Sequence, residues 1–268
     1  MMIEHFIIIA LLGLAVGSFL NVLIYRIPQG ESVSFPASHC PQCQTPLKAW
    51  HNIPFFSWLL LGGRCAFCKK RISFQYPLVE LLTALIFVIV FAKLGWRVES
   101  LFLSLSFIFL LALSIIDWRY KSVPDSLNLL ALIFAIAFSP FTGFHDAIIF
   151  AGGFTLLRFA ISYYLFKKFS FLERRRKPAS WRKNYNIFPS FEAMGEADIM
   201  VAASMGAILG LQVGLFAIFL SALLTLPVAL FRLSTDKQTP FVPFLAAGLF
   251  ISFLFYSHIQ QWLGSLHV

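Results

Sequence analysis

Charged residues are scarce in this chain. Only 12% of its 268 residues are Asp, Glu, Lys or Arg, whereas about a quarter of the residues are charged in an ordinary soluble domain. At the same time, 59% of the residues are hydrophobic. This balance excludes a soluble globular protein and predicts an all-α polytopic membrane protein.

The N-terminus also lacks the charge pattern of a cleavable signal peptide. The first apolar segment is preceded by Glu4, and its positive charge follows it at Arg26. A signal peptide has the opposite order, with basic residues ahead of the apolar stretch. We therefore expect the first apolar segment to be retained as a transmembrane helix.

Acidic residues are outnumbered, with 12 Asp and Glu against 21 Lys and Arg, which gives a net charge of +9. In a soluble protein this excess would suggest nucleic acid, but in a membrane protein basic cytoplasmic loops explain it. We expect no nucleic-acid partner. The basic stretch ERRRK at 173–177 is instead expected to meet anionic lipid.

The apolar runs predict about eight transmembrane helices. A bilayer core about 30 Å thick needs roughly 20 helical residues for each crossing. Runs near this length lie at about 5–25, 77–95, 101–117, 127–143, 147–166, 198–212, 213–231 and 241–263. The sixth and seventh come from one run, which at about 1.5 Å per residue is too long for one crossing. We divide it near Gln212.

The loops between these spans differ strongly in charge. One side of the membrane receives 18 of the 21 Lys and Arg residues, and the other receives only Lys93 and Arg97. The positive-inside rule makes the basic side cytoplasmic and places both termini outside. We divide the chain into a first helix at 1–26, a cytoplasmic cysteine-bearing domain at 27–76 and a seven-helix membrane domain at 77–268.

The chain has only four cysteines, and all of them lie in the first cytoplasmic loop. They form two Cys-x-x-Cys pairs, a pattern close to that of zinc ribbons, made by Cys40, Cys43, Cys65 and Cys68. Four thiolates complete a closed tetrahedral zinc site. Two disulfides are the alternative, but a reducing cytoplasm disfavours them. We expect structural Zn²⁺ that supports the chemistry without performing it.

Three aspartates lie at the cytoplasmic ends of predicted helices, where ionisable groups are costly and usually serve a function. Asp117 ends the third span, where the helix dipole is unfavourable to an anion. Asp125 follows Pro124 and has the pattern of a helix N-cap, which we favour over catalysis. Asp198 opens the sixth span, where the helix dipole would also favour it.

Two carboxyl groups that face each other in a low-dielectric site share one proton. Such a pair can deprotonate water with one acid and protonate a leaving amine with the other, which is aspartic peptide-bond hydrolysis. Asp117 and Asp198 are the candidates for this pair. The spacing alone leaves a second possibility open, a transporter or channel that uses Asp117, Asp125 and Asp198 as cation ligands.

Several collinear stretches resemble the type IV prepilin peptidases, the leader peptidases of bacterial pilus and type II secretion systems. The resemblance covers nearly the whole chain. It includes GLAVGSFLNVLIYRIP at 13–28, the stretch from 52 to 84 with RCAFC and QYPLVELLTA, IDWRYKSVPD, and FEAMGEADIM. The family's catalytic aspartates correspond to Asp117, which opens D-x-x-x-x-x-x-P-D, and to Asp198, which ends the G-x-G-D motif.

The resemblance implies a multi-pass protein of the bacterial inner membrane that cleaves prepilins and pseudopilins after a short basic leader. It further implies methylation of the new N-terminus, with S-adenosylmethionine as methyl donor. No glycine-rich nucleotide loop follows a strand in this sequence, so the methylation rests on the resemblance alone.

The sequence departs from the family at one motif position, where Ala197 replaces the usual glycine. Ala adds a methyl group and disfavours positive φ, which leaves a non-catalytic scaffold as a further possibility. Gly195 and Glu196 belong to the same motif, and Glu196 either acts on the pair or points into water. Glu80, one turn into the second span, either supports the site or makes a structural hydrogen bond.

Overall fold

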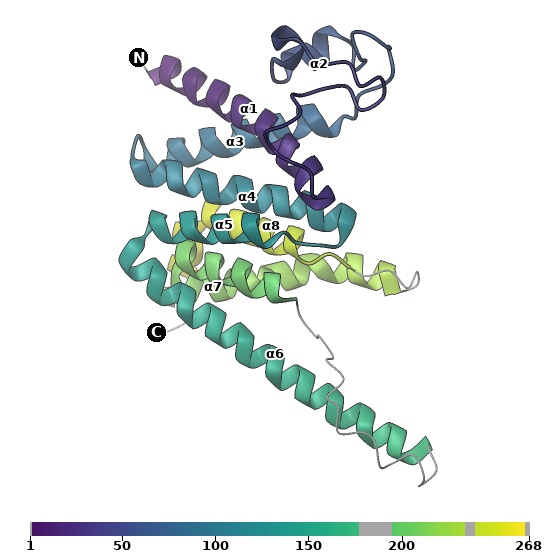
Figure 1. The fold of residues 1–268 in the computed structure, drawn as a ribbon. Helices are drawn as coiled ribbons and strands as arrows, with labels where there is room; N and C mark the ends of the chain where they lie inside the picture. The colour runs from purple at the N-terminus through teal and green to yellow at the C-terminus, as the bar shows by residue number, and fades with distance from the viewer. Residues whose placement is uncertain (1, 177–194, 234–238, 266–268) are drawn as a thin grey trace.

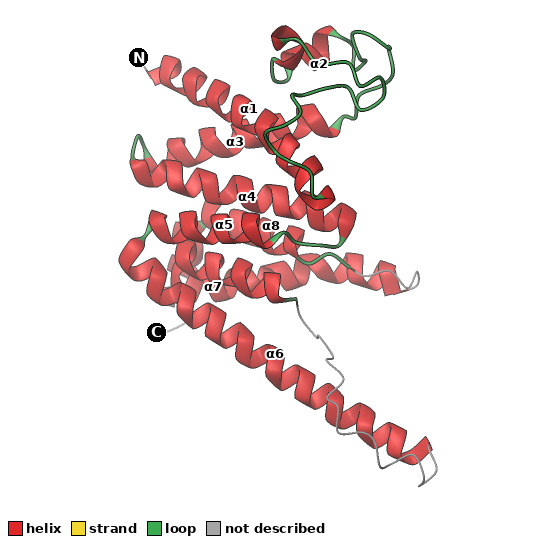
Figure 2. Cartoon of the chain, in the orientation of Figure 1, coloured by secondary structure: helices red, strands yellow, loops and turns green. Residues whose placement is uncertain are grey.

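The computed structural model describes residues 2–176, 195–233 and 239–265. The described part of the chain is mostly helical and contains no strand (Figure 2). The principal helices are α1 (Met2–Arg26), α3 (Gln75–Leu94), α4 (Val98–Tyr120), α5 (Asp125–Phe138), α6 (Pro140–Arg176), α7 (Glu196–Leu233), α8 (Val242–Leu254) and α9 (Tyr256–Ser265). The predicted all-α architecture is thus confirmed.

The helix pair α1 and α3 packs at very short range. A Cβ atom on Gly13 would lie 2.6 Å from Ala84 Cα, and one on Gly17 would lie 2.7 Å from Glu80 Cα. Small residues four positions apart let two membrane helices approach in this way. The close fit places Glu80 of α3 directly against α1.

The cysteine-bearing segment, residues 27–74, joins α1 to α3 and is called the thiol segment below. It contains the short helices η1 (Ile27–Gln29), η2 (Ala49–Asn52) and α2 (Phe56–Leu60). The Arg26 guanidinium donates hydrogen bonds to the carbonyl oxygens of Ser32, Val33 and Pro36. These bonds hold the start of the segment against the end of α1.

The centre of the molecule is formed by α4, α5, α7 and α8, in which α4 and α7 each pack against both α5 and α8. Figure 1 shows α3 and then α1 stacked above α4, with the thiol segment at the end where α4 terminates. The turn between α3 and α4 lies at the opposite end. Helix α6 packs on α7 and then extends away from the bundle.

The number of membrane crossings differs from the predicted eight. Among the described residues, five helices are long and apolar enough to cross a membrane, or six if α8 and α9 count as one span. Those two helices are bent by 82° with respect to each other. Helix α5 ends at Phe138, short of the predicted 127–143, and its 14 residues extend only about 21 Å. The molecule is a membrane protein, but the count of eight is not confirmed.

The long apolar run after Asp198 forms α7, which consists of two helical stretches joined at a non-helical residue. Gly210 has φ 73° and ψ 178°, so two helical stretches meet there. Only glycine adopts this region readily. The predicted division near Gln212 was therefore two residues too late, because the residue able to leave the helix is Gly210.

Candidate functional site

The two Cys-x-x-Cys turns are built alike. In the first, the Cys40 N–H donates to the Thr45 carbonyl oxygen over 3.1 Å, and Gln44 has a positive φ of 57°. An isolated β-bridge between His39 and Pro46 closes the turn. This geometry turns both Cys40 and Cys43 toward the same point.

The second turn repeats each feature at the same spacing. The Cys65 N–H donates to the Lys70 carbonyl oxygen over 2.9 Å, and Lys69 has a φ of 60°. A β-bridge joins Arg64 to Arg71. The thiol segment therefore contains two equivalent ligand turns that face each other.

The four sulfur atoms form one compact group. All lie within 4.8 Å of one another, and the sulfurs of Cys40 and Cys68 are 3.9 Å apart. Zn–S bonds of about 2.3 Å at tetrahedral angles place two sulfurs roughly 3.8 Å apart. All four cysteines are free, whereas a disulfide would hold its two sulfurs at about 2.05 Å. The donor set and its spacing fit a tetrahedral metal ion.

The thiols differ in acidity. Hydrogen bonds from the Thr45 hydroxyl and backbone lower the pKa of Cys43 to about 6. The Cys68 backbone N–H lowers the pKa of Cys65. The backbone N–H of Lys70 also acts to lower the pKa of Cys68, but burial and the other thiols outweigh it and raise that pKa to about 11. Crowded thiols cannot all ionise together unless a cation joins them.

Asp117 lies three residues before the end of α4 and is only 8% exposed. Its Oδ2 accepts a hydrogen bond of 3.2 Å from the backbone N–H of Val242, the first residue of α8. The N–H of Phe241 also interacts with this carboxyl group. The unfavourable dipole at the end of α4 is thus offset by the N-terminus of a second helix, α8.

Asp198 lies in the first turn of α7 and is half-buried. Its backbone N–H donates to the Gly195 carbonyl oxygen over 3.2 Å. The Asp117 carboxylate is close enough to act on Asp198 electrostatically. The fold therefore brings together two aspartates that are distant in the sequence.

Asn128 of α5 supports the start of α7, and it was not predicted as a site residue from the sequence. It is fully buried, and its Nδ2 donates to the Ala197 carbonyl oxygen over 3.0 Å. Its Oδ1 is buried without a partner among the described residues. The signal that could have identified it is a polar residue inside the apolar run DSLNLLALIF.

The remaining motif residues differ in their relation to this carboxyl pair, since Glu196 points away from it and Gly195 lies beside Asp198. Glu196 is 82% exposed at its side chain, and its Oε1 lies 3.1 Å from Nη1 of Arg158. Ala197 lies in the first turn of α7 without the positive φ that would require glycine. A Cβ on Gly195 would sit 3.5 Å from Asp198 Oδ2, which is ordinary contact.

Asp125 does not have the predicted N-cap role. Pro124 is the N-cap residue of α5, and no side chain in the described part of the chain caps this helix. Asp125 is the first residue of the helix itself and is exposed. Its carboxylate is favoured there by the helix dipole, and it forms no hydrogen bond among the described residues.

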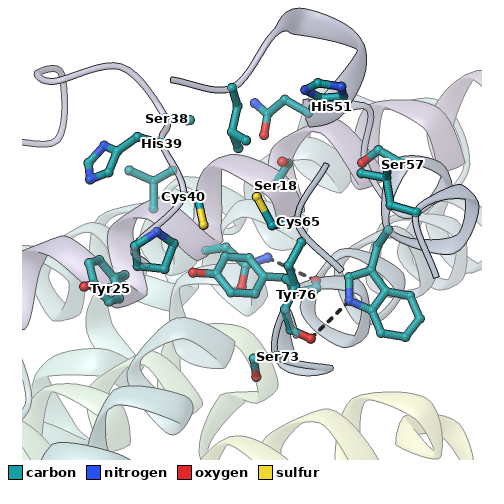
Figure 3. A pocket seen from close by; sticks show the side chains of 18 of the residues that line it. Ser18, Tyr25, Ser38, His39, Cys40, His51, Ser57, Cys65, Ser73 and Tyr76 are labelled. Carbon is teal, nitrogen blue, oxygen red and sulfur yellow. Dashed lines mark hydrogen bonds between the residues drawn. The ribbon is translucent and has the colours of Figure 1, made fainter. Parts of the chain in front are cut away.

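Glu80 faces the thiol segment. Its Oε2 accepts a 2.7 Å hydrogen bond from the backbone N–H of Phe55, a residue with a positive φ of 60°. The Ser18 hydroxyl of α1 also interacts with it. Glu80 therefore links α1, α3 and the thiol segment, and it lines a cavity between them (Figure 3).

Two family descriptions match the chain, "Bacterial Peptidase A24 N-terminal domain" over residues 11–94 and "Type IV leader peptidase family" over residues 104–230. The chain is 33% identical over 281 residues to a protein of Neisseria gonorrhoeae named "Prepilin leader peptidase/N-methyltransferase", covering 91% of this chain and 88% of that one. No solved structure matches the chain significantly.

Other relatives carry the same name. One from Aeromonas hydrophila is 34% identical over 298 residues, covering 96% of this chain and 93% of that protein. One from Pseudomonas putida is 34% identical over 295 residues, covering 97% and 96% respectively. With these matches along nearly its full length, the chain is an enzyme of the type IV leader peptidase family.

Proposed function

We propose that the chain is an intramembrane aspartic endopeptidase that removes the basic leader from type IV prepilins and type II secretion pseudopilins. The observation that carries this proposal is the convergence of Asp117 and Asp198 from separate helices into one electrostatically interacting pair. The printed name of the relatives, prepilin leader peptidase, supports the substrate class.

The mechanism follows from the pair. In a site of low dielectric constant the two carboxyl groups hold one proton between them. The ionised carboxylate accepts a proton from water, and the water oxygen attacks the scissile carbonyl carbon. The protonated acid then gives its proton to the leaving amine nitrogen as the peptide bond breaks.

The surroundings of the pair suit this role. The N–H of Val242 holds the Asp117 carboxyl group through one oxygen. Asn128 holds the backbone directly before Asp198. Positioning of this kind matters because catalytic groups act only in a narrow range of geometry.

The test is cleavage of a synthetic prepilin by the purified protein, followed by mass spectrometry. The expected product lacks the basic leader. Asp117→Asn and Asp198→Asn should each lose this product, whereas the exposed Asp125→Asn should retain it. Retained cleavage in either of the first two variants contradicts the aspartic mechanism.

The main alternative is a transporter or channel that uses aspartates as cation ligands. That function needs several acids along one path. Asp125, the third candidate ligand, is exposed at the start of α5 and, within the described ranges, forms no hydrogen bond to the pair. The two-residue arrangement favours the peptidase.

We also propose that the four thiols bind a structural Zn²⁺. The two equivalent turns supply a complete set of four donors, as in closed structural zinc sites. A segment with little core of its own gains folding free energy from such an ion. Four thiolate ligands would leave the metal no free coordination position for water or substrate. The hydrolysis is therefore assigned to the carboxyl pair.

The proposed location is the bacterial inner membrane, with the carboxyl pair and the thiol segment at the cytoplasmic face. The excess of Lys and Arg in the loops on that side supports this orientation. The basic stretch at 173–177, proposed to meet anionic lipid, lies partly outside the described residues. Methylation of the new N-terminus, with S-adenosylmethionine as donor, is proposed from the name of the relatives.

A further inference from the structure

The short helix α2 of the thiol segment has two unlike faces. Its inner face borders a cavity of about 410 Å³ that lies between α1, α3 and the thiol segment, around Asn21 (Figure 3). Ser57, Trp58 and the C-cap residue Leu61 line this cavity. The Trp58 Nε1–H also donates to the Ile72 carbonyl oxygen over 3.4 Å. The inner face is therefore held against the rest of the thiol segment.

The opposite face of α2 is apolar and uncovered. Phe56, Leu59 and Leu60 are three or four positions apart, so they share one side of the helix. None of the three lines the cavity, and they are 48%, 59% and 86% exposed. These three residues are called the outer face below. A contiguous exposed apolar surface of this kind marks a contact with membrane or with protein.

The outer face continues into the lipid-facing side of α3. The Trp58 ring lies 5.8 Å from the ring of Phe74, the N-cap residue of α3. From there, exposed residues follow the helix at spacings of four, three and four, which is one stripe along its surface. They are Phe74, Leu78, Leu81 and Leu85. Helix α2 thus lies beside the first residue of a stripe that faces lipid in a membrane-spanning helix.

The depth of α2 is set by a contact with the second turn of α3. The backbone N–H of Phe55, the N-cap residue of α2, donates to Glu80 Oε2 over 2.7 Å. Glu80 is five residues beyond Gln75, or about 7.5 Å along the axis of α3. The 20 residues of α3 are about the number needed for one crossing, so its first turn lies at the edge of the apolar core. Helix α2 is level with that edge, and Figure 1 shows it next to this end of α3 on the outer side of the bundle.

The exposed charges of the thiol segment are mostly basic. Glu31 is the one acid between positions 27 and 74, against five Lys and Arg residues. These are Lys48, Arg64, Lys69, Lys70 and Arg71, and all five are exposed. Lys48 Nζ lies 5.2 Å from the ring centroid of Trp50 in η2, which packs against α2. Interfacial helices combine an inserted apolar face with basic residues in this way, and such residues bind anionic headgroups.

We propose that the outer face of α2 inserts into the headgroup boundary of the bilayer that α1 and α3 cross, where the basic residues of the thiol segment bind anionic lipid. Interfacial helices bury their apolar side about 5–10 Å into this boundary, which agrees with the depth given by the contact between Phe55 and Glu80. The occupant is lipid rather than a protein partner because the outer face is continuous with the lipid-facing stripe of α3. The thiol segment is then a membrane-surface domain, and the membrane covers α2 on the side opposite the cavity.

Electron paramagnetic resonance on the full-length, zinc-loaded protein in nanodiscs tests the depth of α2. A spin label attached to a genetically encoded ketone amino acid leaves the four thiols to the metal. A label at position 60 should be several-fold more accessible to oxygen, and several-fold less accessible to a water-soluble nickel chelate, than a label at the exposed position 31. Equal accessibility of the two positions to the nickel chelate overturns the proposal. A position-60 label shielded from both reagents overturns it too, because that result indicates a protein contact.

Protease cleavage within 55–62, measured in nanodiscs that contain phosphatidylglycerol, tests how firmly the outer face is held. Leu60→Gln should raise the cleavage rate about tenfold, since burial of a leucine side chain contributes a factor of at least that size. Leu60→Met keeps the side chain apolar and should match the wild type. Val98→Gln, which removes another exposed apolar side chain at the start of α4, should also match it.

Zinc content at the wild-type level shows that each variant is folded. An unchanged cleavage rate in Leu60→Gln overturns the insertion. Nanodiscs of phosphatidylcholine alone should give faster cleavage of the wild-type segment, because they lack the anionic headgroups. Equal rates in the two lipid compositions overturn the role of anionic lipid.

Discussion

The thiol segment and the carboxyl pair are assembled in different ways. In the thiol segment, each pair of ligands lies in one short turn, and backbone hydrogen bonds within that turn orient the cysteines. In the carboxyl pair, each acid comes from a different long helix, α4 or α7. Their meeting depends on contacts with α5 and α8.

This difference predicts which structural changes each site can tolerate without losing its geometry. A local turn keeps its geometry when distant helices shift, because its hydrogen bonds connect residues a few positions apart. A carboxyl pair between helices depends on the helix packing itself. We therefore expect the zinc site and the peptidase site to fail independently, and the following predictions test that expectation.

The largest effect is expected from neutralising one aspartate. Asp117→Asn or Asp198→Asn removes a group that transfers protons, and such groups contribute about 10²–10⁴-fold to the rate. Cleavage should fall by that amount while zinc content, measured by atomic absorption, stays at the wild-type level. Loss of zinc in these variants would show that the two sites are coupled.

The reciprocal change is Cys40→Ser. Removal of one of four thiolates should release the zinc and with it the folding free energy of the thiol segment. Limited proteolysis should then cut within 31–72, while the membrane helices resist. Cys43→Ser, in the same turn, offers a second variant with the same expected result. Stoichiometric zinc in both variants would mean that the ligands are misassigned.

A smaller effect is expected at Asn128, which positions the start of α7. Asn128→Ala removes the hydrogen bond to the Ala197 carbonyl and leaves that oxygen without it, at a cost of about 1–3 kcal/mol. The kcat for cleavage should fall about tenfold or more, with KM and zinc content unchanged. Ser252→Ala removes a buried hydroxyl that has no partner among the described residues. It serves as the matched control and should keep the wild-type kcat.

The smallest effect is expected from two neighbouring glycines of the thiol segment, Gly62 and Gly63. Both have positive φ, 59° and 66°, but a Cβ on Gly63 would lie 2.8 Å from the Trp58 ring while one on Gly62 meets nothing within 4 Å. Gly62→Ala should cost about 1 kcal/mol for its backbone conformation. Gly63→Ala should cost more, measured by protease resistance of the segment. Equal costs would mean that the ring moves aside freely.

Much of the fold could be predicted because hydropathy is a local property. Every predicted apolar segment from 5–25 to 241–263 coincides wholly or largely with described helices. The number of these segments that cross the membrane could not be predicted in the same way. Whether α8 and α9 form one span depends on the 82° bend at Phe255, and α5 is short because the chain leaves the helix at Ser139.

The candidate site was predicted correctly where it depends on residues close in the sequence, and not where it depends on packing between helices. The four cysteines could be grouped from their spacing, and the structure places them in one cluster. The prediction that Asp125 is the N-cap of α5 was wrong by one residue. Which residue is the N-cap depends on where the backbone enters the helix, and Pro124 occupies that position. Asn128 and the cavity around Asn21 were missed because their partners are distant in the sequence.

The sequence alone determined that this is a helical membrane protein with two paired thiol motifs, since apolar length and short turns depend on near neighbours. The tertiary structure decided that Asp117 meets the N-terminus of α8, that Asn128 holds the start of α7, and that a cavity opens between α1, α3 and the thiol segment. These features arise from packing between helices, and packing depends on all the side chains at each contact.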